Sequence, residues 1–301
     1  PVDAPRTYLQ SVLGNRFDAA RVNSFLEAAP KMVEFLSAHG FRFEAGNAIC
    51  DIYGDQPGAG TGGRSLIAAP FNARPLGARL SLLRKTKRET AFAGMPIQAG
   101  PDLGAFLNAT RKPSAFLHVV KRVVGHAIDL ATQRRATHLV NGVALVARLF
   151  DLAERHKVRW LTSAKATQLT ELDGAVSGAE LAMADGPVRV MARRGVLLAT
   201  GGFSQAKALT ASHFPHAADH ASLAVPEADG SGLALARAVG GGFETDLAAS
   251  GAWCPVSRVI WPDGQDGIFP HIIERGKPGV IAVRANGERF VNEANGYHDF
   301  V

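Results

Sequence analysis

The stretch RGVLLATGGF, residues Arg194–Phe203, decides the fold class of this chain. Its apolar part, residues 196–199, is short and ends on two glycines, which predicts a β-strand buried on both faces rather than a helix. Gly201 and Gly202 permit positive φ and let a ligand approach the backbone closely. Ser204 would then N-cap the helix that follows. Such a strand, turn and helix start can bind a phosphate or a ribose, although an ordinary strand-to-helix turn has the same spacing.

Two later motifs extend this pattern. ADGSGLALA, residues Ala228–Ala236, places a carboxylate and glycines ahead of an apolar helix, and GERFVNE spans Gly287–Glu293. Together with GVLLATGGFS, and in this order, they resemble the flavoprotein family of fumarate reductases, succinate dehydrogenase flavoprotein subunits and 3-ketosteroid dehydrogenases. The resemblance extends over nearly the whole chain and favours the 3-ketosteroid dehydrogenase-like members. It implies an α/β (α+β) fold: a partial Rossmann-like FAD-binding domain with a β-meander, then the start of an α+β cap domain.

A domain boundary is expected near Thr245, because the composition changes after Gly240-Gly241-Gly242 toward tryptophan, proline and extended segments. The FAD-binding domain would cover residues 1–245, without its N-terminal dinucleotide turn, and the substrate-binding cap domain would begin within 246–301. Apolar spacing and turn residues predict the secondary structure. Helices are expected in 17–40, with Pro30 opening a second helix, in 102–135 and over 141–155; strands are expected over 158–161, 166–172, 175–183 and 188–192. The apolar side of the 141–155 helix is assigned to Val143, Leu145, Val146, Leu149 and Leu152.

Composition indicates a globular protein, with 47% apolar and 20% charged residues. No apolar run approaches the ~18 residues of a membrane span. The formal charge of +6 is spread widely, and the densest basic run is residues 79–88. That run could contact nucleic acid or an anionic membrane, but we read it as a solvated loop because it lacks interleaved aromatic residues. The sequence therefore predicts neither a nucleic-acid partner nor a membrane partner.

Cysteine usage and the first residue suggest the setting of the chain. Cys50 and Cys254 are far apart, which favours a reducing, cytoplasmic compartment over a disulfide scaffold, and no Cys or His spacing indicates a metal site. The chain starts at Pro1 without an initiator methionine or signal peptide. We read it as an internal piece of a longer protein, whose missing N- and C-terminal parts would be its partners.

Residues 58–63 formally match G-x-G-x-x-G, the pattern of a dinucleotide-binding turn. They follow Asp55-Gln56-Pro57 instead of a buried strand, and Pro70 soon follows them, so no helix opens there. An acidic residue at the spacing needed for a ribose is also missing. We therefore interpret this segment as a flexible loop.

The resemblance implies which residues contact FAD. The matching aspartate of the family, here Asp229, contacts the flavin dinucleotide, and the backbone matching Ala166 hydrogen-bonds the adenine ring. On the residues alone, Asp229 reads as a helix N-cap and Ala166 as a small residue packed in a sheet. The full set of implied cofactor contacts is Ala166, Thr200, Gly201, Gly202, Asp229 and Gly230.

Tyr297 is the expected catalytic residue. Fumarate reductases place a proton-donating arginine four residues after the glutamate of the FVNE motif, whereas this chain places Tyr297 four residues after Glu293. An arginine suits a dicarboxylate, whereas an ionised tyrosine could abstract a proton from a carbon beside a ketone. Tyr53 resembles a tyrosine that lines the steroid site and would assist. Without the resemblance, Tyr297 could equally anchor a turn and Tyr53 could pack in the core.

The sequence thus predicts part of an FAD-dependent oxidoreductase acting on CH–CH bonds beside a carbonyl, with hydride transfer to FAD and a ketone or steroid-like substrate. One alternative is a fumarate reductase-like reductase of an unsaturated carboxylic acid. Another is a non-catalytic remnant or binding module of the same fold. Because the pyrophosphate-binding turn is missing, we expect the 301 residues alone to be inactive and not to retain FAD.

Overall fold

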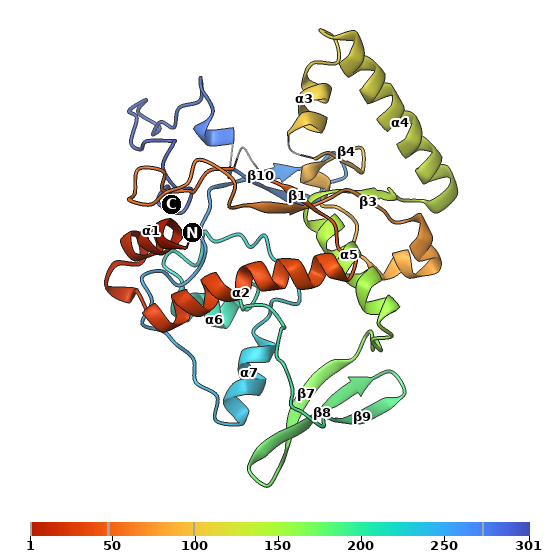
Figure 1. Cartoon of the computed structure of the whole chain (residues 1–301), viewed down its shortest axis with the longest axis vertical. Coiled ribbons are helices and arrows are strands. Elements are labelled where there is room, and N and C mark those ends of the chain that lie inside the picture. The colour runs from red at the N-terminus through yellow and green to blue at the C-terminus, as the bar shows by residue number, and fades with distance from the viewer. Residues whose placement is uncertain (1, 47–48, 99, 273) are drawn as a thin grey trace. The chain divides into compact units, whose positions relative to one another are not determined.

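A computed structural model describes residues 2–46, 49–98, 100–272 and 274–301 (Figure 1). The chain divides into two compact units, and each is described by itself. Unit 1 comprises residues 1–158, 260–269 and 294–296, and unit 2 comprises residues 159–259, 270–293 and 297–301. The expected domain boundary near Thr245 lies within unit 2 and stays a prediction.

Unit 1 is mainly helical, with short antiparallel strand pairs β1–β2, β3–β6 and β4–β5. Its helices and strands are α1 (Asp3–Leu13), α2 (Ala19–Ala38), β1 (Phe43–Ala45), β2 (Leu66–Ala68), β3 (Phe71–Asn72), β4 (Ala91–Phe92), β5 (Met95–Pro96), α3 (Pro101–Leu107), α4 (Pro113–Gln133), β6 (His138–Leu139) and α5 (Asn141–Arg155). Helix α5 packs against β2, β3 and β6. Ala144 and Ala147 of α5 are fully buried, because their small side chains allow the backbones to approach closely.

The helix expected over 141–155 is confirmed, and Leu152 and Val143 of its predicted apolar side do pack in or against the core, but the other three residues of that side do not. Leu145, Val146 and Leu149 are exposed, whereas the neighbouring arc, with Ala144 and Phe150, enters the core. The apolar stripe is wide enough to offer two sides, and packing against the small strands selects one of them. Pro30 also lies inside one continuous helix, α2, rather than opening a second helix.

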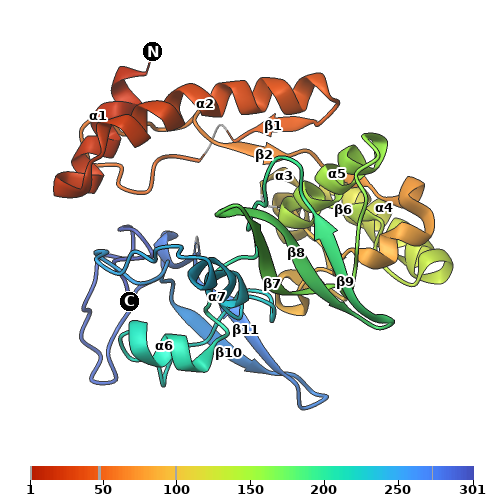
Figure 2. The same cartoon turned by 90° about the horizontal axis from the view of Figure 1, so that it is seen from below.

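Unit 2 contains an antiparallel meander with strand order β7-β8-β9 (Figure 2). Its elements are β7 (Lys165–Leu172), β8 (Ala175–Met183), β9 (Gly186–Met191), α6 (Lys207–His213) and α7 (Ser231–Ala238). Two further strands, β10 (Val256–Ile260) and β11 (Asp266–Pro270), form a separate two-stranded sheet. Asp173 and Gly174 both have positive φ at the β7–β8 turn, as a two-residue type I′ hairpin requires. The predicted meander is confirmed.

The strand expected over residues 196–199 is not formed, and neither is the one over 158–161. No strand among the described residues pairs with 196–199, and Leu197 is 89% exposed. An apolar run becomes a buried strand only where neighbouring strands and helices cover both of its faces. The run therefore forms no strand. Among the described residues, no helix combines the length and apolar character needed to cross a membrane.

Candidate active site

The glycine turn and the start of α7 meet in unit 2. The N–H of Gly230 donates to the carbonyl of Gly202 at 3.2 Å, and the N–H of Gln205 donates to the carbonyl of Ala228 at 3.0 Å. Two motifs that are separate in the sequence therefore share one backbone-lined wall. Ser204 does not N-cap α6, because Ala206 takes that place and the Ser204 hydroxyl lies 2.8 Å from the Ser222 hydroxyl.

This wall is tightly packed on one side and open on the other. A Cβ on Gly232 would lie 1.9 Å from Oγ1 of Thr200, so α7 approaches the turn as closely as a glycine allows. At Gly230, φ is 78° and a Cβ would lie 2.6 Å from Cδ1 of Leu209. By contrast, a Cβ on the exposed Gly202 would meet nothing within 4 Å. The turn thus leaves room for a ligand on the side away from α7.

Asp229 presents a carboxylate beside the turn. It is exposed and accepts a hydrogen bond from the N–H of Ser231 at 2.9 Å. The hydrogen bonds from Ser231, and more weakly the charge of Lys165, lower the pKa of Asp229 below its ordinary value. Gly230 rather than Asp229 occupies the N-cap position of α7, so the plain N-cap interpretation of Asp229 is wrong. An ionised, exposed carboxylate next to a helix start can accept hydrogen bonds from sugar hydroxyls.

Ala166 lies on β7, half-buried and opposite Leu181 of β8. Strand β7 packs against α7 within unit 2. The six predicted cofactor residues therefore belong to one unit, and they come from the meander, the glycine turn and the start of α7. Their contacts with FAD stay predictions.

A run of aromatic side chains leads from the glycine turn to Trp253. The ring of Phe203 lies 5.4 Å from that of Phe214, which lies 4.8 Å from that of Trp253, centre to centre. A cavity of about 280 Å³ opens here, and Ser204, Trp253 and Cys254 are among its lining residues. Burial raises the pKa of the Cys254 thiol. Aromatic walls with few polar groups suit an apolar ring.

The segment that carries Tyr297 adjoins this aromatic run. The N–H of Trp253 donates to Nδ1 of His298 at 3.2 Å, which fixes the neighbour of Tyr297 to the cavity wall. Tyr297 is half-buried, and the guanidinium carbon of Arg275 lies 5.9 Å from the centre of its ring.

Glu293 is a structural anchor that the sequence analysis left without a role. It is 4% exposed and accepts the N–H of Ala282 at 2.7 Å, while Arg289 binds both of its carboxylate oxygens. The hydrogen bonds from Arg289, followed by that from Ala282, lower the pKa of Glu293 to about 2. Arg275 donates to the Glu293 carbonyl. Residues 289–293 form no helix, so their sequence spacing alone did not indicate this pair.

Tyr53 belongs to unit 1, so its pairing with Tyr297 stays a prediction. Tyr53 is half-buried, and its N–H donates to the hydroxyl of Tyr8 at 3.2 Å. In the nearby glycine loop, the N–H of Gly60 donates to the carboxylate of Asp51 at 2.7 Å, and Arg64 pairs with the same carboxylate. A carboxylate of the chain thus occupies the place a phosphate would need. No group of three or more His, Cys, Asp or Glu suited to a metal ion occurs in the described part of the chain.

Comparison with known sequences decides the family. The profile described as "FAD binding domain" matches residues 1–301. The chain belongs to the FAD-binding domain family. This confirms the flavoprotein family, the fold class and the cofactor type that the three motifs predicted.

Known relatives of this FAD-binding domain are dehydrogenases of oxo compounds. The chain is 35% identical to 4-oxocyclohex-2-ene-1-carboxylate 5-dehydrogenase of Sinomonas cyclohexanicum, over 98% of this chain and 50% of the relative. It is 29% identical to 3-oxosteroid 1-dehydrogenase of Mycobacterium tuberculosis, over 98% of this chain and 52% of the relative. The chain spans about half the length of these curated relatives.

A solved structure shows the same fold. It is the 3-ketosteroid delta1-dehydrogenase of Sterolibacterium denitrificans in complex with 1,4-androstadiene-3,17-dione. The TM-score is 0.81 at 26% identity, and the match covers all of this chain and 54% of the other. The chain therefore has the FAD-binding flavoenzyme fold of a ketosteroid dehydrogenase.

The residues of unit 2 fit an FAD. The open side of Gly202, the exposed carboxylate of Asp229 and the start of α7 provide close backbone approach, a hydroxyl acceptor and the positive end of a helix dipole. A side chain at Gly230 or Gly232 would push the turn and the helix apart. These are the features that a dinucleotide needs from its protein.

Proposed function

We propose that the protein carrying this chain is an FAD-dependent dehydrogenase that oxidises a C–C bond beside the ketone of a cyclic substrate. The observation that carries the proposal is the continuity of unit 2 from the glycine turn, through Phe214 and Trp253, to the segment of Tyr297. The relatives' names support it, because each describes an oxo compound losing hydrogen.

Residues of the glycine turn, the start of α7 and strand β7 would hold FAD. Asp229 would accept hydrogen bonds from its sugar hydroxyls, and the turn at Gly201 and Gly202 would lie against the dinucleotide. The backbone of Ala166 would hydrogen-bond the adenine, and Thr200 would hold the turn against α7 through Gly232. When bound, FAD supplies the hydride acceptor of the reaction.

Tyr297 would take a proton from the carbon next to the carbonyl. That proton is acidic because the carbonyl delocalises the charge left behind, so a tyrosinate is a competent base. Arg275, 5.9 Å from the ring centre, supplies positive charge beside Tyr297. Tyr53 would assist by donating its hydroxyl proton to the carbonyl oxygen, which stabilises the charge that develops there.

The substrate class we propose is a cyclic ketone. This description covers both the oxosteroid and the oxocyclohexene carboxylate named for the relatives. The aromatic cavity lining supports a flat apolar ring. Tyr297, at the position where a fumarate reductase has an arginine, argues against an unsaturated dicarboxylate as the substrate.

Anaerobic mixing of the full-length protein with candidate substrates tests this proposal. We expect the yellow flavin to bleach with a 3-oxosteroid or a 4-oxocyclohexane carboxylate, and whichever bleaches faster identifies the substrate branch. Reduced enzyme that is reoxidised by fumarate but not by an enone would favour the reductase alternative. A colourless protein that stays colourless when given FAD would favour the non-catalytic alternative.

We also propose a cytoplasmic location. The free thiols Cys50 and Cys254 support it, because unpaired cysteines are usual where thiols stay reduced. Cell fractionation tests it, and recovery of the protein from a periplasmic or secreted fraction would contradict it.

A further inference from the structure

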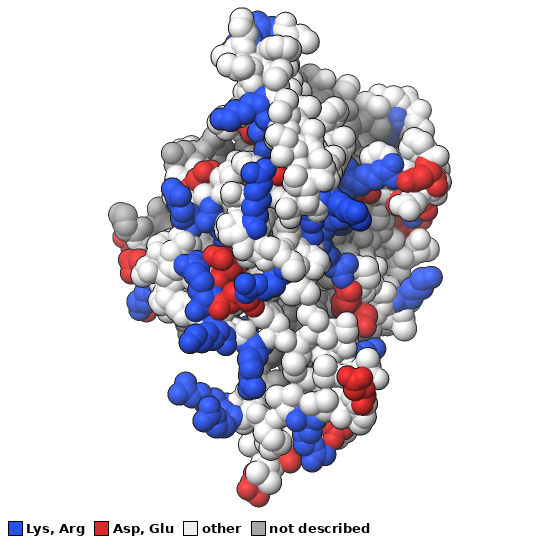
Figure 3. Space-filling view, turned by 90° about the vertical axis from the view of Figure 1, so that its right-hand side faces the viewer, with Lys and Arg blue, Asp and Glu red and all other residues white. Residues whose placement is uncertain are grey.

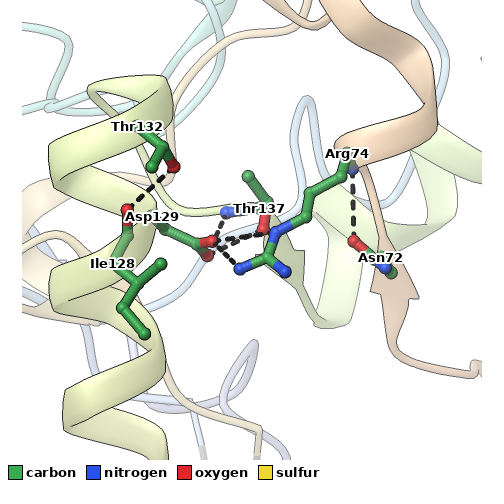
Figure 4. A network of polar contacts seen from close by, with 6 residues as sticks. All are labelled: Asn72, Arg74, Ile128, Asp129, Thr132 and Thr137. Carbon is green, nitrogen blue, oxygen red and sulfur yellow. Dashed lines mark hydrogen bonds and ion pairs between the residues drawn. The ribbon is translucent and has the colours of Figure 1, made fainter.

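Helix α4 turns its polar side toward the rest of unit 1 and its apolar side outward. The carboxylate of Asp129 accepts three hydrogen bonds: from Nη2 of Arg74 at 2.7 Å, from the hydroxyl of Thr137 at 2.7 Å and from the N–H of Thr137 at 2.9 Å. Figure 4 shows Asp129 pointing to Arg74 and Thr137, while the neighbouring Ile128 points away from them. Burial alone would raise the pKa of Asp129, but these hydrogen bonds outweigh it and lower the pKa.

A second polar cluster holds α4 in the same orientation. Nε2 of His118 lies 2.6 Å from the carboxylate of Asp102 on α3, and Nε of Arg122 lies 3.3 Å from it. Nη2 of Arg122 also donates to the carbonyl of Pro96 at 2.7 Å. The inner side of α4 borders a cavity of about 490 Å³. Rotating the helix to bury its apolar side would break both clusters, so the orientation is strongly determined.

The outer side of α4 is a continuous apolar stripe. Its side chains are between 39% and 69% exposed. The stripe, which we call the α4 stripe, consists of Phe116, Leu117, Val120, Val123, Val124 and Ile128. At helical spacing these residues share one side of the helix. A helix of a globular domain normally buries such a stripe, and an exposed patch of this kind marks an interaction surface.

The exposed charges of the segment that carries the α4 stripe are all positive. Residues 101–137 contain six basic residues but only two acidic ones, Asp102 and Asp129, and both acids are enclosed by the clusters described above. The exposed cations of this segment are Arg111, Lys112, Lys121 and Arg134. On the face of the molecule that Figure 3 shows, blue side chains outnumber red ones.

Although the sequence predicted no membrane partner, we propose that α4 is a lipid-docking helix, which lies on an anionic membrane surface with the α4 stripe inserted between headgroups. An interfacial helix combines an apolar side with flanking Lys and Arg and needs no span of the bilayer. Anionic lipid complements a surface that has four exposed cations and no exposed carboxylate. A twofold contact between two copies through this face would instead place one positively charged surface against an identical one.

Vesicle sedimentation of the purified full-length protein tests the proposal. We expect binding to vesicles containing phosphatidylglycerol, weaker binding to pure phosphatidylcholine, and release by high salt. The double variant Leu117→Ser/Val124→Ser should reduce the partition coefficient at least about tenfold, because two exposed apolar side chains are lost from the inserted side. Lys112→Gln/Lys121→Gln should reduce binding to anionic vesicles about fivefold per lysine and leave neutral vesicles unaffected.

A matched control removes two equally exposed apolar residues elsewhere. Leu172→Ser/Met191→Ser changes side chains that are 62% and 60% exposed on the meander, and it should leave vesicle binding unchanged. The proposal is overturned if wild-type protein fails to bind anionic vesicles. It is also overturned if the α4 variant Leu117→Ser/Val124→Ser binds them as well as the control variant does. A wild-type dimer that Leu117→Ser/Val124→Ser dissociates would likewise overturn it. So would protection of the α4 stripe from chemical labelling in the free monomer, because the protein's own chain would then cover the stripe.

Discussion

Asp102 and Asp129 of unit 1 use their carboxylates in the opposite way to Asp229 of unit 2. In unit 1, Asp102 and Asp129 are enclosed by arginine, histidine and threonine, and every carboxylate oxygen of Asp129 is bonded. In unit 2, Asp229 is exposed beside an open glycine turn and bonds only the residue two positions on. A fully partnered carboxylate stabilises its surroundings, whereas an exposed one next to open backbone is available to a ligand.

The largest expected effect separates the two tyrosines. Tyr297→Phe in unit 2 should lower turnover by about 10²- to 10⁴-fold, because it removes the proposed base. Tyr53→Phe in unit 1 should cost about tenfold, as expected for an assisting hydrogen bond. Steady-state kinetics with a cyclic ketone would measure both, with flavin absorbance as the check on cofactor content. Unimpaired turnover in Tyr297→Phe would remove the catalytic assignment of unit 2.

Two glycines at the same helical position provide the next test. Gly232 and Gly142 are the second residues of α7 and α5, but a Cβ meets Thr200 at 1.9 Å in the first case and nothing within 4 Å in the second. Gly232→Ala should force the turn away from α7, at a cost of about 1–3 kcal/mol, and weaken FAD binding. Gly142→Ala should be neutral or stabilise by up to about 1 kcal/mol.

Titration of each variant with FAD, together with urea unfolding, would distinguish these outcomes. The control is Gly232→Ala combined with Thr200→Ala, which removes Oγ1 and should recover part of the loss. Equal FAD affinity in the Gly232→Ala variant and the wild type would show that the turn does not depend on its contact with α7.

The two aspartates should respond in opposite ways to the same substitution. Asp129→Asn in unit 1 should lower the free energy of unfolding by about 2 kcal/mol, since the half-exposed Arg74 loses its buried partner, without changing FAD affinity. Asp229→Asn in unit 2 should leave the Tm unchanged and weaken FAD binding. Thermal melts measure the Tm and FAD titrations measure the affinity of each variant. A lower Tm for Asp229→Asn would show that Asp229 stabilises the fold.

The smallest expected effect is a pH dependence of unit 2. Glu293 has a pKa lowered to about 2, so its contribution to stability is full above the unfolded pKa of about 4.3 and is lost as pH falls through the folded value. The Tm of wild-type protein should fall steadily as the pH is lowered from about 4.3 to about 2. Glu293→Gln should have a lower Tm at neutral pH and a flatter acid dependence. Parallel acid curves for the two proteins would contradict the assigned pKa.

The sequence predicted the candidate site better than it predicted the structure of residues 196–199. The glycine turn and the motif at Ala228 were predicted to adjoin one ligand, and the bond between Gly230 and Gly202 brings them together. Local motifs carry such information, because turn and helix-start geometry depend on a few adjacent residues. The failed strand at 196–199 depends on partners elsewhere, which no local pattern reveals.

The anchor at Glu293 shows the same limit inside the site. Its pairing with Arg289, its burial and its bond to Ala282 depend on how the loop closes. The environment of Tyr297 likewise required the positions of Arg275 and Trp253, which are distant in sequence.

The sequence by itself determined the family, the meander with its Asp173-Gly174 turn, and the length of α5, because turn chemistry and apolar periodicity are local properties. Only the tertiary structure decided which side of each amphipathic helix is buried. Periodicity groups Leu145 with Leu149 on α5 and Phe116 with Val120 on α4, yet both pairs are exposed. The choice of side depends on what packs opposite, namely small strands for α5 and the ionic clusters of Asp102 and Asp129 for α4.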